Sequence, residues 1–212
     1  TSQGLGMPTV AVLTAMEQPL GRFVGNALEV RQAVEILRGD ETAADYLECL
    51  LALGGWMLKL AGLSKSANEG SLLMRSKIAD GSGYRLFRDC VKAQGGNVDV
   101  IDDISLLPKA KLSRTVRAAK SGFISALDAR KVGHAAVMLG AGRAFKEQEL
   151  DYGAGLELLK KVGDRVAKGD PVAILHAADE TKLRLGESEY RDALVISAKA
   201  VRPRSVVLEI IK

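Results

Sequence analysis

The chain opens with a short apolar run that is followed by a helical pattern. Val10–Leu13 is unbroken apolar sequence, which predicts a strand buried on both faces. A tight connection is predicted next by one proline and two glycines, Pro19, Gly21 and Gly25. Asn26 then predicts a helix N-cap, with Glu29 able to reach back to it and Gly39 at the far end. Strand, loop and helix together indicate an α/β protein without indicating a function.

Three further helices are predicted over residues 41–63, 70–79 and 84–94 from apolar positions at helical spacing. Thr42 and Asp45 form a candidate capping pair for the first of them. Gly54 and Gly55 interrupt it, and because paired glycines weaken a helix interior, we expect a kink or a very close helix contact there. In the last helix the apolar face consists of Leu86, Phe87, Cys90 and Val91.

After about residue 112 the pattern changes to short strands. Residues 115–127 predict one or two strands around Gly122, and Asp128 predicts the cap of a helix ending at residue 139. Residues 155–177 carry two Gly-Asp turn dipeptides six residues apart, typical of a hammerhead or barrel-sandwich sheet. A short helix at 187–191 and strands at 194–198 and 205–211 follow.

These patterns predict the end of a mixed-sheet α/β domain with several helices, followed by a small α+β domain with a hammerhead-like sheet. The composition shifts between residues 95 and 120, where acidic residues, Pro108 and then basic residues follow one another. We therefore predict a domain boundary there, giving domains over residues 1–111 and 112–212.

Composition narrows the class of protein. The 212 residues are 47% hydrophobic and 26% charged, which indicates a globular chain. No apolar run approaches the ~20 residues that span a bilayer, and no signal peptide is recognisable, so no membrane role and a cytoplasmic location are predicted. Cys49 and Cys90 lack the spacing of a disulfide framework or a zinc site.

The formal net charge of +4 does not predict a nucleic-acid partner. Basic and acidic residues are interspersed, and the basic run from Lys109 to Lys120 carries no aromatic residues for stacking on bases. A solvated connector is the simpler interpretation of that run.

Four segments resemble one known family, in that family's order. They are LTAMEQPLGRFVGNALEV, GSGYRLFRDCVKAQGG, GFISALDARKVGHAAVMLGAGR and KVGDRVAKGDP. All four are similar to segments of the thymidine and pyrimidine-nucleoside phosphorylases, and the resemblance covers the whole chain as the C-terminal half of a family member. It implies phosphate-dependent cleavage of the N-glycosidic bond, giving free base and (deoxy)ribose 1-phosphate, in nucleoside salvage.

The resemblance also implies what lies outside this sequence. Members carry a phosphate-binding glycine-rich loop and the residues that contact the base in their first half, and none of those motifs occurs here. We therefore predict no catalytic residue in this chain, no phosphorolysis by the chain alone, and a missing N-terminal half as its partner. No organic cofactor is implied; phosphate is a co-substrate beside the pyrimidine nucleoside, and the full-length enzyme is expected to be a homodimer.

Two sites are carried over by position. The family holds a monovalent cation, potassium, with main-chain oxygens that correspond to Leu20 and Phe23 and an acidic side chain that corresponds to Gln32. A neutral amide is a weaker ligand than a carboxylate for a hard cation, so a structural loop without an ion is the alternative. Arg143, in the LGAGR turn, is the candidate for contacting substrate phosphate; the alternative is an ordinary helix C-terminus.

Other candidate chemistry is weaker. His134 has no carboxylate three or four residues further along its helix, and His176 is most simply a strand-end residue, so both are predicted to be structural. The Gly-Asp turns also resemble biotinyl and lipoyl carriers, but Lys160, Lys161 and Lys168 lie outside the hairpin setting of a modified lysine. A non-catalytic carrier or binding module, or a structural subunit, remains the alternative function.

Overall fold

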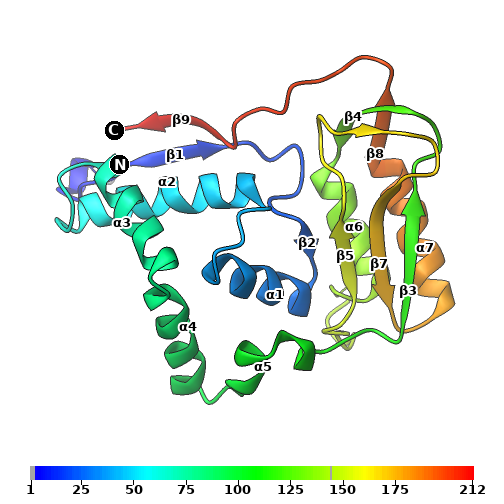
Figure 1. The fold of residues 1–212 in the computed structure, drawn as a ribbon, viewed down its shortest axis with the longest axis horizontal. Helices are drawn as coiled ribbons and strands as arrows, with labels where there is room; N and C mark the ends of the chain where they lie inside the picture. Colours follow the sequence, from blue (N-terminus) through cyan, green and yellow to red (C-terminus); the bar gives the residue numbers. More distant parts are fainter. Residues whose placement is uncertain (1–2, 144) are drawn as a thin grey trace. The chain divides into compact units, whose positions relative to one another are not determined.

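The computed structural model describes residues 3–143 and 145–212, which form two compact units. The first, here called the helical unit, comprises Thr1–Ala15, Val34–Ile101 and Arg204–Lys212. The second, the sheet unit, comprises Met16–Ala33 and Asp102–Pro203. The predicted mixture of helices and sheets is confirmed (Figure 1), and a boundary near residue 112 stays a prediction. Within the described part of the chain, no helix has the length and apolar character needed to cross a bilayer.

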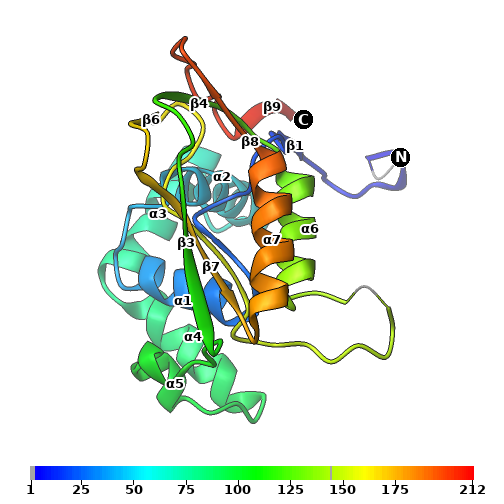
Figure 2. The same ribbon diagram turned by 90° about the vertical axis from the view of Figure 1, so that its right-hand side faces the viewer.

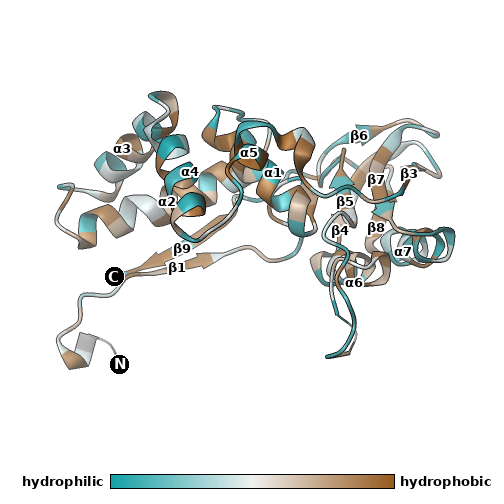
Figure 3. Cartoon of the chain, turned by 90° about the horizontal axis from the view of Figure 1, so that it is seen from below, coloured by the Kyte–Doolittle hydropathy of each residue, from teal (hydrophilic) through white to brown (hydrophobic). Residues whose placement is uncertain are grey.

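In the helical unit, strand β1 (Ala11–Thr14) pairs antiparallel with β9 (Val207–Ile211). Figure 3 shows the apolar colouring of this pair. The prediction that the first strand is buried on both faces is wrong, because burial alternates along β1 and Leu13 is 41% exposed. Among the described strands β1 has a single hydrogen-bonded neighbour, so its other edge is open.

Helix α1 (Asn26–Leu37) begins one residue earlier than predicted. Gly25, not Asn26, occupies the cap position: the Glu29 N–H donates to Gly25 O at 2.8 Å, and the Gly25 N–H donates to Glu29 Oε1 at 3.1 Å. The backward reach of Glu29 is therefore confirmed, onto a glycine with a φ of +140°. Gly39 ends the helix with a φ of +95°, as predicted.

Besides the end of α1, the helical unit contains α2 (Ala44–Leu60), α3 (Ala67–Ala79), α4 (Ser82–Ala93) and most of α5 (Asp99–Asp102). The predicted cap of α2 is wrong, since Thr42 bonds to Asp40 instead and no side chain caps the helix. Helix α3 begins three residues before its predicted start, after the cap residue Ser66, whose side chain accepts from the Glu69 N–H at 3.1 Å. The apolar face expected for α4 is not buried: Leu86 is 66% exposed.

The adjacent glycines of α2 make the close helix contact that the sequence predicts. Helix α2 runs through Gly54 and Gly55 without a break, and both are buried. A Cβ at Gly70 of α3 would lie 2.6 Å from Gly55 O, closer than real Cβ contacts allow. The two helices therefore approach through backbone at Gly55 and Gly70.

The sheet unit contains two antiparallel sheets. One has the strand order β2 (Phe23–Val24), β5 (Gly155–Leu158), β7 (Pro171–Ala177) and β3 (Leu112–Arg117). The other has the order β6 (Arg165–Val166), β4 (Gly122–Leu127) and β8 (Leu194–Ser197). Strands β2 and β5 lie about 130 residues apart in sequence, and their pairing brings residues 23–24 into this sheet. The hammerhead detail stays a prediction.

Helices α6 (Ala129–Leu139) and α7 (Glu180–Ala193) cover one face of the sheet that contains β3 and β7 (Figure 2). The Asp128 cap of α6 is confirmed, with its side chain accepting from the Lys131 N–H at 3.0 Å. Helix α7 has 14 residues, so the prediction of a short helix at 187–191 is wrong. The 3-10 helices are η1 (Gln3–Leu5) and η2 (Ile104–Leu106).

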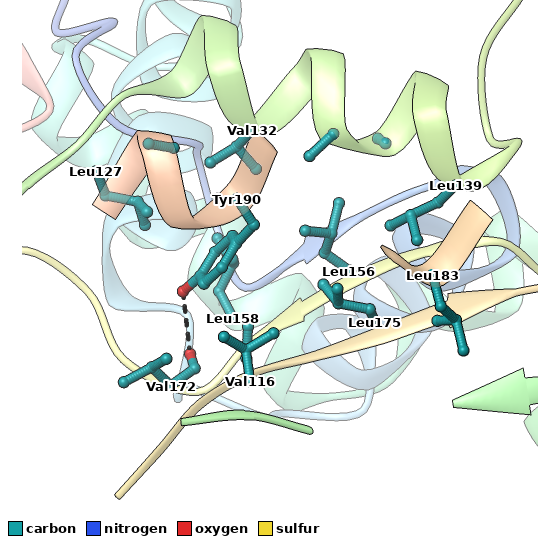
Figure 4. Packing of buried hydrophobic residues seen from close by; sticks show 14 of the residues in the cluster. Val116, Leu127, Val132, Leu139, Leu156, Leu158, Val172, Leu175, Leu183 and Tyr190 are labelled. Carbon is teal, nitrogen blue, oxygen red and sulfur yellow. Dashed lines mark hydrogen bonds between the residues drawn. The ribbon is translucent and has the colours of Figure 1, made fainter. Parts of the chain in front are cut away.

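Between these helices and the sheet lies the main hydrophobic core, which Figure 4 shows from close by. Tyr190 of α7 is completely buried there, and its hydroxyl donates to Val172 O at 3.3 Å. Burial raises the pKa of Tyr190, so the phenol is neutral in the folded protein. Leucines and valines of both helices and the sheet surround it: Val116, Leu127, Val132, Leu139, Leu156, Leu158, Leu175 and Leu183.

The contact between α6 and α7 depends on a glycine. A Cβ at Gly186 of α7 would lie 2.5 Å from Cγ and Cδ2 of Leu139, which is fully buried. Gly186→Ala should therefore destabilise the chain by about 2 kcal/mol through overpacking. Urea unfolding followed by circular dichroism measures the change in free energy.

Gly133→Ala on the facing helix is the matched control. Gly133 is exposed, its φ is not positive, and nothing lies within 4 Å of a Cβ there. This variant should be more stable by about 0.5–1 kcal/mol, because alanine is the better helix former. Equal effects of the two substitutions would contradict the close packing of α6 on α7.

Candidate functional site

The loop from Pro19 to Phe23, which carries the predicted cation ligands, is bonded to the end of β5 and to the segment after it. The Lys161 ammonium donates to Pro19 O and, at 2.9 Å, to Gly21 O. The Leu158 N–H donates to Arg22 O at 2.7 Å. All of these groups belong to the sheet unit. The loop is thus held by residues that follow it by about 140 positions.

Gln32, near the middle of α1, lies against the same loop. It is 3% exposed, and its Oε1 accepts from the Arg22 N–H at 2.6 Å. Gly21 makes room for it: a Cβ at Gly21 would lie 2.8 Å from the Gln32 Cδ, and Gly21 has a φ of +72°. Glycine at position 21 therefore serves both the turn and the close approach of the amide.

These contacts fit the potassium site implied by the resemblance poorly. The Gln32 oxygen already accepts a backbone N–H, and position 32 supplies no negative charge. The loop carbonyls beside Leu20 already accept from a cation, the Lys161 ammonium. Like charges repel, so a second cation beside this ammonium is disfavoured unless a carboxylate compensates the charge. Potassium at Leu20, Phe23 and Gln32 stays a prediction.

The start of α1 and the LGAGR turn, two segments that carry the resemblance, lie together in the sheet unit. Asn26 Nδ2 donates to Ala141 O at 2.9 Å, and the Ala27 N–H donates to Tyr152 O at 3.1 Å. The backbones of the two segments also meet at two glycines: a Cβ at Gly155 would lie 3.0 Å from Gly25 Cα. The segment around residue 25 therefore packs against residues 141 and 152–155.

Arg143 lies just beyond this contact. Helix α6 ends at Gly140 with a φ of +109°, which fits the alternative that the LGAGR turn is an ordinary helix C-terminus. The Arg143 side chain is exposed, and its Nε donates to Gln148 O at 3.1 Å. A contact between this guanidinium and phosphate stays a prediction.

Both histidines have neighbours from other helices or strands, which residue spacing along the sequence does not indicate. His134 Nδ1 lies 3.0 Å from Glu189 Oε2, a carboxylate of α7 rather than of its own helix. His176 lies on β7, between Ser113 of β3 and Gly155 of β5 in the register. Its Nε2 is buried without a hydrogen-bond partner among the described residues. Burial lowers the pKa of His176, which favours the neutral ring at pH 7.

A pocket of about 460 Å³ opens beside His176 within the sheet unit. Its wall combines the apolar residues Ala27, Leu28 and Leu107 with the cationic side chains of Arg31, Lys109 and Lys111. The basic run predicted to be a solvated connector thus forms part of a pocket wall. No group of three or more histidines, cysteines and carboxylates that could hold a metal ion occurs among the described residues.

Lys161 and Asn26 are the polar residues of this region that sequence reasoning missed. The sequence presents Lys161 only as a candidate carrier lysine, whereas its ammonium bonds to two carbonyls of the loop. The sequence predicts Asn26 as a helix cap, whereas its amide donates to the LGAGR turn. Both bonds join positions more than 100 residues apart, a relation that local spacing cannot indicate.

Comparison with known proteins gives a consistent result. Residues 123–197 match the pyrimidine nucleoside phosphorylase C-terminal domain. The chain is 39% identical to the pyrimidine-nucleoside phosphorylase of Bacillus subtilis over 202 residues, which are 95% of this chain and 46% of that protein. The Geobacillus stearothermophilus enzyme is also 39% identical, and the Staphylococcus haemolyticus enzyme 38%, over 92% and 94% of this chain.

The matched part of each of these relatives is 46% of its length, so the chain spans about half the length of the curated relatives it matches. The family match on residues 123–197 places that half at the C-terminal side. With similarity that extends from the α1 segment through the C-terminal domain, the chain belongs to the thymidine and pyrimidine-nucleoside phosphorylase family, as a C-terminal portion of about half a member's length.

Proposed function

We propose that this chain is the C-terminal part of a pyrimidine-nucleoside phosphorylase, which uses phosphate to cleave the N-glycosidic bond of a pyrimidine nucleoside. The products are the free base and (deoxy)ribose 1-phosphate. The observation that carries the proposal is the 39% identity to enzymes of that name over 95% of this chain. The bond between Asn26 and the LGAGR turn adds support, because it joins two segments of the resemblance directly.

The chemistry requires groups that we assign to the N-terminal half. In the transition state the sugar gains positive charge and the departing base gains negative charge. A catalyst therefore needs a phosphate cradle of N–H groups and side-chain donors, together with cationic or hydrogen-bonding groups at the base carbonyls. The present chain serves as scaffold for these groups and closes over the nucleoside; by itself it does not turn nucleoside over.

Arg143 is the residue of this chain that we assign to substrate. Its guanidinium follows a helix end fixed by Gly140 and is exposed, with only the Nε bonded to Gln148 O in the described contacts. A guanidinium can bind two phosphate oxygens at once through parallel N–H groups. In the complete enzyme Arg143 contacts the phosphate from the side of the C-terminal domain. That enzyme is a cytoplasmic homodimer and needs no organic cofactor.

Joining the chain to the N-terminal half of the Bacillus subtilis enzyme should restore phosphorolysis. The chain alone should release no thymine or uracil from thymidine or uridine with phosphate, because it lacks the phosphate cradle. The fused protein should release base at a rate well above the background. Chromatography of the free base measures both rates.

Two results would contradict the proposed function. One is turnover by the purified chain alone. The other is a fused protein that unfolds cooperatively yet releases no base. The fused protein with the matching C-terminal half of the Bacillus subtilis enzyme is the positive control.

Arg143→Ala in the active fused protein should raise the KM for phosphate by about 10- to 100-fold, the loss expected for hydrogen bonds to a charged partner. The KM for nucleoside should change little. Arg130→Ala is the matched control, because Arg130 is exposed on α6 and precedes the packed end of that helix. Unchanged phosphate kinetics in Arg143→Ala would remove Arg143 from the site.

A further inference from the structure

We infer that the pocket beside His176 binds an organic phosphate monoester, that is, a phosphate group attached to an apolar body. All residues that line the pocket belong to the sheet unit. The inference concerns this pocket and does not depend on the proposed reaction.

The charges of the pocket wall select an anion. Its cationic side chains are Arg31 of α1 and, from the segment before β3, Lys109 and Lys111. No aspartate or glutamate is among the described residues that line it. A cleft with apolar walls and charges of one sign concentrates the electric field and attracts ions of the opposite sign. Three positive charges suit a phosphate monoester, with a charge of about −2 at pH 7, better than a monocarboxylate.

The rest of the wall suits the group to which the phosphate is attached. Apolar side chains line it from three segments of the sheet unit: Leu28, Ile104, Leu107, Pro108 and Leu112. The volume of about 460 Å³ lies in the range of pockets that hold small organic molecules. Inorganic phosphate would leave most of this apolar surface in contact with water, whereas an aromatic or aliphatic ester would cover it.

Backbone contacts join the walls of the pocket. A Cβ at Gly153 would lie 2.4 Å from Lys109 C and Ala110 N, so the lysine-bearing segment packs directly on the backbone of residue 153. The Ala27 N–H donates to Tyr152 O at 3.1 Å, which attaches the start of α1 to the same place. Because the walls are held together before any ligand arrives, little conformational entropy is lost on binding.

Arg31 and His176 lie on the inner side of the pocket. The Arg31 guanidinium is held over the Phe23 ring, 5.0 Å from its centroid. The neighbours of His176 along β7 point into the main core, so His176 faces the side of the sheet opposite to α6 and α7 (Figure 2). Burial lowers the pKa of His176, Glu157 opposes this change, and the positive charge of Arg31 adds to it.

The first test compares three ligands by isothermal titration calorimetry of the chain at one ionic strength. Phenyl phosphate carries both the charge and the apolar group, inorganic phosphate carries the charge alone, and benzyl alcohol is neutral. Phenyl phosphate should bind at least 10-fold more tightly than either of the others. Absence of phenyl phosphate binding would overturn the inference, and so would equal affinity for phenyl phosphate and for inorganic phosphate or benzyl alcohol.

Replacing the two lysines of the wall tests where the anion binds. The double variant Lys109→Met with Lys111→Met should bind phenyl phosphate about 10-fold more weakly, because charge-assisted hydrogen bonds to the phosphate are lost. Lys120→Met with Lys199→Met is the matched control: it removes the same charge from two exposed lysines outside the pocket and should bind as the wild type does. Equal losses in the two variants, or no loss in the first, would overturn the inference.

NMR of the imidazole groups locates the ligand even if the lysine variants do not fold. The chain contains two histidines, and His134→Gln identifies the signals of His176. Saturating phenyl phosphate should shift the His176 signals and raise the pKa of His176, because a nearby anion favours the imidazolium against the charges of Arg31, Lys109 and Lys111. The His134 signals should not move. A bound phenyl phosphate that leaves the His176 signals and pKa unchanged would contradict the assignment of this pocket.

Discussion

The close approach of two backbones at Gly25 and Gly155 is the constraint on which the sheet unit depends. Neither position has room for a Cβ, and both glycines have φ values near +140° that other residues rarely adopt. Because the backbones meet here, β2 can pair with β5, and α1 can start where Asn26 reaches the end of α6. The early segment of the chain is therefore an integral part of the sheet unit.

The polar contacts of the loop follow from that pairing. Once β2 is a strand beside β5, the loop before β2 must lie against the turn after β5, where Lys161 is located. The ammonium and the Gln32 amide then satisfy groups of the loop that would otherwise need water. The pairing of β2 with β5 therefore also determines which polar groups contact the loop.

Local signals in the sequence predicted helix ends well where one residue determines them. Gly39 and Asp128 are examples: glycine readily adopts the positive φ that ends a helix, and aspartate carries the carboxylate that caps one. The start of α1 was placed one residue late, since either Gly25 or Asn26 could take the cap position and only the backbone conformation distinguishes them. Helix α7 was predicted too short, although its buried positions Leu183, Gly186, Tyr190 and Ala193 follow a helical spacing across the glycine.

The family and its candidate positions could be read from the sequence, and the contacts at those positions could not. Gln32 and Leu20 were identified by resemblance, but the ammonium beside them comes from position 161. Likewise His134 finds its carboxylate, Glu189, on the neighbouring helix. Pairs of this kind depend on how helices and strands pack, and a single sequence carries no direct record of packing.

Strand β2 lies about 130 residues before its partner β5, which affects the choice of truncated forms of this protein. A polypeptide that starts after residue 33 would keep β5 but lose the strand that covers its outer edge. Unpaired strand edges recruit other chains and promote aggregation. Expression of the C-terminal sheet region is therefore best designed with residues 16–33 included, even though most of the intervening sequence belongs to the helical unit.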